Sequence, residues 1–98
     1  MDRLYRAVKD AIDDYYQNSQ EWDCEEWLQA IEDAAKRIHP NQDVLIFDYD
    51  TGNDTYELDR QLDDIIGAMT KYDCVEYCNV WDDQTVVTVI CANKKKDV

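Results

Sequence analysis

The spacing of apolar residues constrains the fold of this chain more strongly than any motif does. A helical spacing is found in three segments, at residues 2–17, 23–39 and 55–71. Short runs rich in β-branched and aromatic residues, which are typical of strands, are found at residues 44–47, 74–81 and 85–92. The order α-α-β-α-β-β predicts an α+β domain, in which the helices pack on one face of a small sheet that includes a C-terminal antiparallel hairpin.

The second predicted helix has the clearest boundaries. Asp23 is a favourable N-cap residue, and Glu26 three residues later completes the pattern of a capping box. Trp22 precedes the cap and Trp27 lies four residues beyond it, which is the spacing of a hydrophobic staple. The helix is expected to end just before Pro40, which cannot continue it.

The C-terminal hairpin is predicted to have one buried face and one face that is too apolar to be left in water. Pairing of Trp81 with Gln84 would place six small or β-branched residues on the first face: Cys74, Cys78, Val80, Val87, Val89 and Cys91. The second face would carry five apolar and two polar residues: Val75, Tyr77, Trp81, Val86, Ile90, Asn79 and Thr88. We expect a helix or a partner to cover part of this second face.

Length and composition indicate one domain, residues 1–93, followed by a disordered basic tail, residues 94–98. The first residues lack the apolar core of a signal peptide, and no apolar run approaches transmembrane length. We therefore expect a cytoplasmic protein with no membrane partner. In that compartment the four cysteines are expected to be reduced and buried: Cys24, Cys74, Cys78 and Cys91.

The charge of the chain is strongly one-sided. It has 23 acidic and 10 basic residues, a formal net charge of −13 over 98 residues. Residues 10–35 contain nine carboxylates and no Lys or Arg. Such a charge opposes the compact state by self-repulsion and repels nucleic-acid phosphates, but it attracts a positively charged partner. The composition therefore argues against direct nucleic-acid binding and predicts a basic protein partner.

The acidic segment after the first predicted strand suggests two kinds of site. Asp48 and Asp50 follow an apolar strand, and over about ten residues this pattern resembles the first motif of the haloacid dehalogenase family. That resemblance implies a larger parallel sheet, a separate Lys and a further acidic pair, for which 98 residues leave no room. The alternative is a calcium loop with ligands Asp48, Asp50, Asp54 and Asp59, but Asn53 replaces its turn glycine and a strand precedes it. A solvated turn that caps the third helix is the simpler interpretation.

Other chemistry-bearing groups are sparse. His39 is the only histidine, and we expect it to interact with carbonyl groups at the end of the second helix. Cys74, Cys78 and Cys91 have a poor spacing for a zinc site. Two glycines cannot build a phosphate-binding loop. We therefore expect no cofactor and no enzymatic activity.

In size, charge and lack of an active-site motif, the chain resembles the small phage-encoded inhibitors of bacterial defence, the anti-CRISPR and anti-restriction proteins. Several members of that class are DNA mimics. The resemblance implies an acidic inhibitor that binds the nucleic-acid-binding site of a basic nuclease or effector complex in the host cytoplasm. Two other classes fit the composition: an immunity protein or antitoxin that caps a basic nuclease toxin, and an acidic soluble structural or dimeric protein without mimicry.

Clusters of acids and aromatic residues supply the candidate partner-binding residues. Carboxylates one helical turn apart can imitate part of duplex DNA, which carries one negative charge about every 1.7 Å. Aromatic side chains surrounded by acids make strong interface centres. The candidates are Asp10, Asp13, Asp14, Glu25, Glu32, Asp33, Asp59, Asp63, Asp64, Asp82, Asp83, Tyr77 and Trp81.

Overall fold

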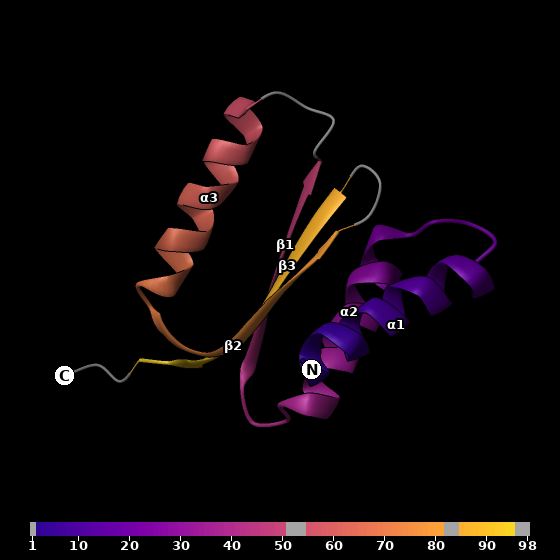
Figure 1. Cartoon of the computed structure of the whole chain (residues 1–98), viewed down its shortest axis with the longest axis horizontal. Coiled ribbons are helices and arrows are strands. Elements are labelled where there is room, and N and C mark those ends of the chain that lie inside the picture. The colour runs from indigo at the N-terminus through magenta and orange to yellow at the C-terminus, as the bar shows by residue number, and fades with distance from the viewer. Residues whose placement is uncertain (1, 51–54, 82–84, 96–98) are drawn as a thin grey trace.

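The computed structural model describes residues 2–50, 55–81 and 85–95 and contains three helices and three strands (Figure 1). In chain order the elements are α1 (Arg3–Asn18), α2 (Cys24–Ile38), β1 (Asp43–Asp50), α3 (Thr55–Met69), β2 (Tyr72–Trp81) and β3 (Thr85–Lys94). This order confirms the predicted α-α-β-α-β-β arrangement and the α+β class. Within the described ranges, no helix has both the length and the apolar composition needed to cross a membrane.

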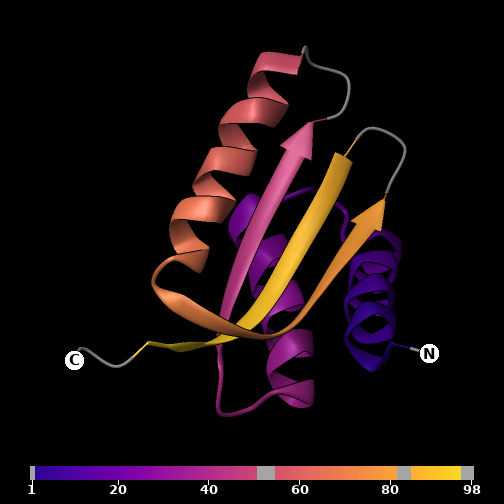
Figure 2. The ribbon, with the colours of Figure 1, turned by 60° about the vertical axis from the view of Figure 1, so that its left-hand side comes forward.

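The sheet lies between two helical layers. β3 is its central strand and pairs antiparallel with β1 on one side and with β2 on the other. α1 and α2 cover one face of the sheet, whereas α3 lies across the other face (Figures 1 and 2). The expectation that the helices share one face therefore holds for α1 and α2 only. The reason is that the second face of the hairpin is also apolar and gives α3 a surface to cover.

The main core lies between the sheet and the α1/α2 layer. Leu4, Val8, Ile31 and Ala35 of the two helices are fully buried. They pack with five residues of the sheet: Cys78, Val80, Val87, Val89 and Cys91. Because β3 is covered on both faces, all of its residues from 86 to 92 are buried. This explains why the β3 sequence is a nearly continuous apolar run rather than an alternation.

The register of the hairpin differs from the predicted one by two residues. Trp81 pairs with Val86 instead of Gln84, and Gln84 itself lies outside the described residues. Because side chains alternate with a period of two, a shift of two residues preserves which of them share a face. The predicted division of the hairpin into two faces is therefore confirmed over most of its length.

A β-bulge in β2 makes Cys74 the exception. The pairing skips Val75, so that Cys74 lies opposite Ala92 and Glu76 lies opposite Cys91. The extra residue moves Cys74 from the expected core face to the α3 side of the sheet. All four cysteines are free, as expected, and two of them are buried. The expectation of burial is wrong for Cys74 and for Cys24, which are exposed.

The start of α2 follows the predicted signals. The Asp23 carboxylate accepts hydrogen bonds from the backbone N–H groups of Glu25 and Glu26, at 2.9 and 3.3 Å. The ring centroids of Trp22 and Trp27 are 6.3 Å apart, which confirms the hydrophobic staple. Trp27 is buried, whereas Trp22 stays exposed.

The Tyr15 hydroxyl joins α1 to the start of α2. It donates to the Asp23 carbonyl at 3.1 Å and accepts from the Asp23 N–H at 2.7 Å. In a capping box, this N–H would donate to the Glu26 side chain. Tyr15 therefore takes the place of Glu26 as the partner of that group.

β3 extends into the segment that was expected to be a disordered tail. Lys94 pairs with Tyr72 in the sheet. The Lys95 N–H donates to the Lys71 carbonyl at 2.9 Å. The backbone of these two residues is therefore hydrogen-bonded, and the remainder of the expected tail, residues 96–98, lies outside the described residues.

Candidate functional site

The residues singled out in the sequence lie on both sides of the sheet. One group belongs to the α1/α2 layer: Asp10, Asp13, Asp14, Glu25, Glu32 and Asp33. A second group belongs to α3 and to the side of β2 that faces it: Asp59, Asp63, Asp64, Tyr77 and Trp81. Asp82 and Asp83 lie outside the described residues. The sheet separates the two groups, so that no single groove contains them all.

An open groove lies between α1 and α2, and we call it the acidic groove. Its volume is about 850 Å³. Its carboxylates are Asp14 from α1 and Glu32 and Asp33 from α2. The small side chains of Ala11 and Ala30 also line it. The acidic groove therefore gathers carboxylates from two helices on one surface.

Hydrogen bonds hold the acids of α2 in place. The Gln29 side-chain Nε2 donates to Asp33 Oδ1 at 2.9 Å and to Glu32 Oε2 at 3.4 Å. Lys36 and Arg37 also line the acidic groove. They lie in the last turn of α2, where the helix dipole favours cations. The acidic groove thus has three carboxylates and a positively charged boundary at the C-terminal end of α2.

The other predicted acids of this layer lie around the acidic groove. Asp13 accepts a hydrogen bond from Lys9 Nζ and forms an ion pair with it, at 3.0 Å. Asp10 is exposed but does not line the acidic groove. Glu25 lines a smaller depression of about 440 Å³ next to β1, and Glu32 borders both depressions. Glu25 therefore extends the acidic surface, whereas the charge of Asp13 is partly neutralised.

A second groove lies between α3 and the sheet, and we call it the apolar groove. Its volume is about 600 Å³. Tyr77 and Trp81 line it while 60% and 67% of their surfaces stay exposed. The other lining residues are Tyr49, Leu62, Ile65, Met69, Cys74, Asn79, Val86, Thr88 and Ile90. The predicted cover over the second hairpin face is thus present, but it is partial.

Polar groups at the apolar groove are few. The buried Thr88 hydroxyl donates to Asn79 Oδ1 at 2.7 Å, which satisfies it. On α3, Asp59 and Asp63 are exposed and lie one helical turn apart. At 100° per residue they project beside Leu62. Of the two, Asp59 lies nearer to the helical side of the apolar groove, and neither carboxylate lines it.

Three exposed apolar residues of α3 and β2 were not among the candidate partner-binding residues. Leu62, Ile66 and Val75 keep 54%, 55% and 47% of their surfaces exposed. Helical spacing assigns Leu62 and Ile66 to the apolar face of α3. It does not show how much of that face the sheet covers, and so it does not predict their exposure. The useful signal was the strongly apolar second face of the hairpin, which a single helix covers only in part.

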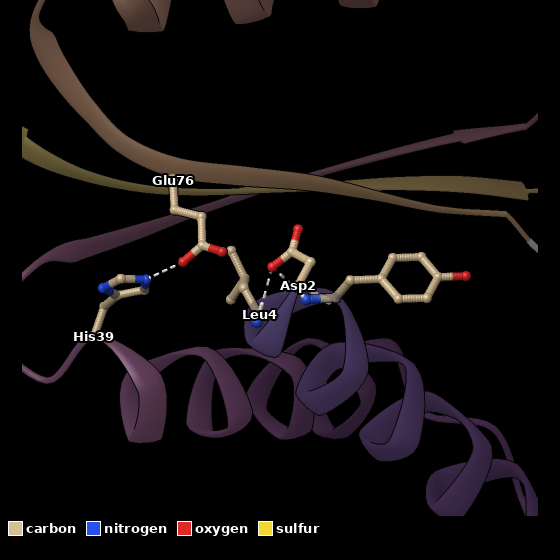
Figure 3. A network of polar contacts seen from close by, with 5 residues as sticks. Asp2, Leu4, His39 and Glu76 are labelled. Carbon is tan, nitrogen blue, oxygen red and sulfur yellow. Dashed lines mark hydrogen bonds and ion pairs between the residues drawn. The ribbon is translucent and has the colours of Figure 1, made fainter.

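A polar network joins α1, α2 and β2 next to the core (Figure 3). The Asp2 carboxylate accepts hydrogen bonds from the N–H groups of Leu4 and Tyr5, at 3.1 and 3.3 Å. A hydrogen bond with the Glu76 side chain is the main cause that holds the pKa of Asp2 below its ordinary value. The two N–H groups lower that pKa further, against the opposing effect of burial. Asp2 is therefore an anionic cap at the start of α1.

His39 has a different role from the expected one. Its imidazole pairs with the Glu76 carboxylate of β2 and not with carbonyl groups of its own helix. The backbone N–H of His39 donates to the Ala35 carbonyl at 2.9 Å and closes α2. Sequence spacing could not reveal the Glu76 contact, because the two residues are 37 positions apart.

The two buried thiols are poor nucleophiles. Burial is the main cause that raises the pKa of Cys78 to about 12, with added contributions from the carboxylates of Asp2 and Glu76. Burial likewise raises the pKa of Cys91 to about 11, with Glu76 as the next cause. Both thiols are therefore protonated at neutral pH.

Within the described ranges, no group of three or more His, Cys, Asp or Glu residues is placed to hold a metal ion. Of the four candidate calcium ligands, Asp48 in β1 and Asp59 in α3 are both exposed. Asp54 and the side chain of Asp50 lie outside the described part of the chain.

Comparisons of the chain with protein-family models, with curated proteins and with solved structures gave no match. The functional argument therefore rests on the two grooves and on the charges around them.

Proposed function

We propose that this chain is a non-enzymatic inhibitor whose acidic groove occupies the nucleic-acid-binding site of a basic partner, a nuclease or an effector complex, in the cytoplasm. The proposal places it with the DNA-mimic inhibitors of bacterial defence. It rests on one observation: Asp14 of α1 converges with Glu32 and Asp33 of α2 on a single open groove.

The spacing of the helices supports mimicry of DNA. Packed helices lie about 8–10 Å apart, which is between the widths of the two grooves of DNA, about 6 and 12 Å. At such a spacing, the Asp14 carboxylate of α1 and the Glu32 and Asp33 carboxylates of α2 support contact with a DNA-binding surface. The net charge of −13 attracts a basic surface from a distance, so that association is fastest at low salt.

Two of the four thiols are poorly suited to nucleophilic catalysis. The thiols of Cys78 and Cys91 are buried, and their pKa values are raised to about 12 and about 11. A thiol attacks as its thiolate, which is scarce for both groups at neutral pH.

The proposal is tested with two variants that remove the same charge from opposite sides of the sheet. D14N/E32Q/D33N neutralises the acidic groove, and D59N/D63N/D64N neutralises three acids of α3. Each immobilised full-length protein is incubated with bacterial lysate at low salt. It is then eluted with a short DNA duplex and afterwards with a salt gradient. We expect the duplex to release a basic DNA-binding protein from the wild type, and retention to fall about tenfold for the acidic-groove variant only.

Two results would contradict the proposal. Equal loss of retention in both triple variants would make the net charge responsible, not the acidic groove. A retained partner that salt releases but the DNA duplex does not would show that the chain and DNA bind different sites.

An immunity protein or antitoxin is the second candidate, and the exposure of Tyr77 and Trp81 favours it. Exposed aromatic residues with acids nearby are typical centres of tight interfaces. In that case Trp81→Ala alone would remove most of the affinity for a toxic nuclease. For a DNA mimic, affinity falls gradually as single acids are neutralised. A comparison of the single-residue losses therefore separates the two functions.

A further inference from the structure

β2 is an edge strand whose second half is open to an added strand. It pairs with β3 on one side only. Natural edge strands are protected by charged residues, Pro or β-bulges, and in β2 the bulge and both charges, Asp73 and Glu76, lie at or before residue 76. The strand also exposes three large apolar side chains, Val75, Tyr77 and Trp81. From Glu76 to Trp81 its pairing with β3 is regular, so the backbone there has the geometry to accept another strand.

The helical layer on the other face also continues past β2. α1 packs on β2, and α2 packs on β1. In Figure 2, α1 lies beyond β2 on the side away from α2. Tyr5 and Tyr16, which are 40% and 49% exposed, lie on the flank of α1 opposite to Asp14, given 100° of rotation per residue. A strand added about 4.8 Å beyond β2 would therefore contact α1 on one face and the apolar groove on the other.

We propose that β2 binds one extended segment of the cationic partner by strand addition, as a fourth strand of the sheet. The identity of the occupant rests on the proposed function, whereas the binding surface does not. Side chains of the segment that face α3 are aliphatic and cover Tyr77 and Trp81. The alternate side chains face α1 and are Lys or Arg.

The charges around β2 select these basic residues. Glu76 lies on the α1 side of β2, where it contacts His39 and keeps 30% of its side chain exposed. The anionic cap Asp2 lies close to it (Figure 3). Asp73, near the start of β2, is exposed as well. A segment with alternating aliphatic and basic residues would therefore place a cation next to Glu76 and aliphatic groups next to the rings of Tyr77 and Trp81.

A second copy of this chain fits the same edge poorly. Pairing of β2 with β2 of another copy would bring the two α1 helices to about the strand spacing of 4.8 Å, whereas packed helices need about 8–10 Å. Steric fit therefore favours a single segment over a second copy.

The test uses synthetic peptides of about eight residues, the length of an ordinary strand, and the full-length protein. The main probe alternates Val and Lys. One control peptide has the same composition with all Val before all Lys, and another alternates Val and Glu. Binding is followed by the fluorescence anisotropy of a label on the peptide. Trp81→Ala is compared with Trp22→Ala, because these two tryptophans are similarly exposed, at 67% and 59%.

We expect the alternating Val-Lys peptide to bind most tightly and Trp81→Ala to weaken its binding about tenfold. Trp22→Ala and D14N/E32Q/D33N should change it less than about threefold. Hydrogen exchange should slow at every second backbone N–H between Glu76 and Trp81, because strand addition protects only the groups that point away from β3. Peptide binding with alternate protection of the β2 amides supports strand addition. This holds even if D14N/E32Q/D33N still retains a partner from lysate, a result that would count against the proposed function alone.

Three results would overturn the proposal. One is equal binding of the alternating and the block peptide, or binding that Trp81→Ala does not change. Another is uniform protection, or no protection, of the β2 amides when the peptide is bound. The third is a dimer in sedimentation equilibrium that Trp81→Ala dissociates, which would make a second copy the occupant of the edge.

Discussion

Two helices close one face of the sheet, whereas a single helix leaves the other face partly open. On the closed face, Leu4, Val8 and Ile31 are fully buried. On the open face, Tyr77 and Trp81 are more than half exposed. Packed helices lie about 8–10 Å apart and strands about 4.8 Å apart, so that two helices match the width of three strands and one helix does not. The apolar groove lies between α3 and the part of the sheet that this single helix leaves uncovered.

This difference shows how one small domain can present two kinds of surface. On the closed face the apolar side chains are buried in the core, and the outer side of the helices carries charged side chains. On the open face the apolar side chains remain accessible and form a groove. The first surface suits long-range attraction of a basic partner, and the second suits short-range contact with apolar groups.

The reactivity of the cysteines should show this contrast most strongly. Cys78 and Cys91 point into the closed face, whereas Cys74 lines the apolar groove. A pKa raised from 9.0 to about 12 lowers the thiolate fraction of Cys78 about thousandfold at pH 8. With Ellman's reagent we expect only Cys24 and Cys74 to react in the native protein. The Cys24→Ser variant should then show one reactive thiol, and rapid reaction of all four thiols in the wild type would contradict a closed face.

Truncation of one apolar side chain on each face should lower the free energy of unfolding by different amounts. Ile31→Ala removes a fully buried side chain and should lower the free energy of unfolding by about 2–5 kcal/mol. Leu62→Ala removes a side chain that is 54% exposed and should cost less than about 1 kcal/mol. Urea unfolding measures both values. A loss at Leu62 as large as that at Ile31 would mean that α3 is packed as tightly as the other helices.

Removing the N-cap of α1, Asp2, should lower the free energy of unfolding by a smaller amount that depends on pH. Asp2→Ala should destabilise the fold by about 1 kcal/mol at neutral pH, as should the matched cap variant Asp23→Ala. The pKa of Asp2 in the folded protein is lowered from the ordinary value of 3.8. Its ionised form therefore stabilises the fold above that pH, and this stabilisation is lost as the pH falls below it.

Asp2→Asn isolates the charge, because Asn is also a good N-cap residue. Thermal unfolding between about pH 2 and 6 should show a shallower loss of stability on the acidic side for this variant than for the wild type. Identical pH profiles would rule out a contribution of the Asp2 carboxylate.

Much of the secondary structure follows from local patterns in the sequence. The Asp23 cap and the staple of Trp22 and Trp27 are short-range features, and they are found as predicted. The two faces of the hairpin were also assigned correctly despite the wrong register, because a shift of two residues keeps every side chain on its face. The bulge at Val75 broke this rule for Cys74, and no residue type in β2 marks a bulge.

The features that the sequence did not predict depend on how elements distant in the chain pack against each other. Both faces of the hairpin are apolar, and the sequence therefore did not predict that α3 packs on the face opposite to α1 and α2. The carboxylates were recognised as clusters, but their division between two sides of the sheet follows from that topology. The contact between His39 and Glu76 likewise depends on the docking of β2 against the end of α2.

The position of β3 has a consequence for how the protein is made. β3 is the central strand of the sheet, yet it comes last of the three strands along the chain. β1 and β2 do not pair with each other, so each must wait for β3 before any sheet forms. While a ribosome is still producing residues 85–94, the amphipathic α1 and α2 have each other but no sheet to cover them. Sheet formation is then a late step in which β1 pairs with a strand that follows α3 and β2 in the chain. Contacts of such long sequence separation slow folding and prolong the exposure of apolar surface.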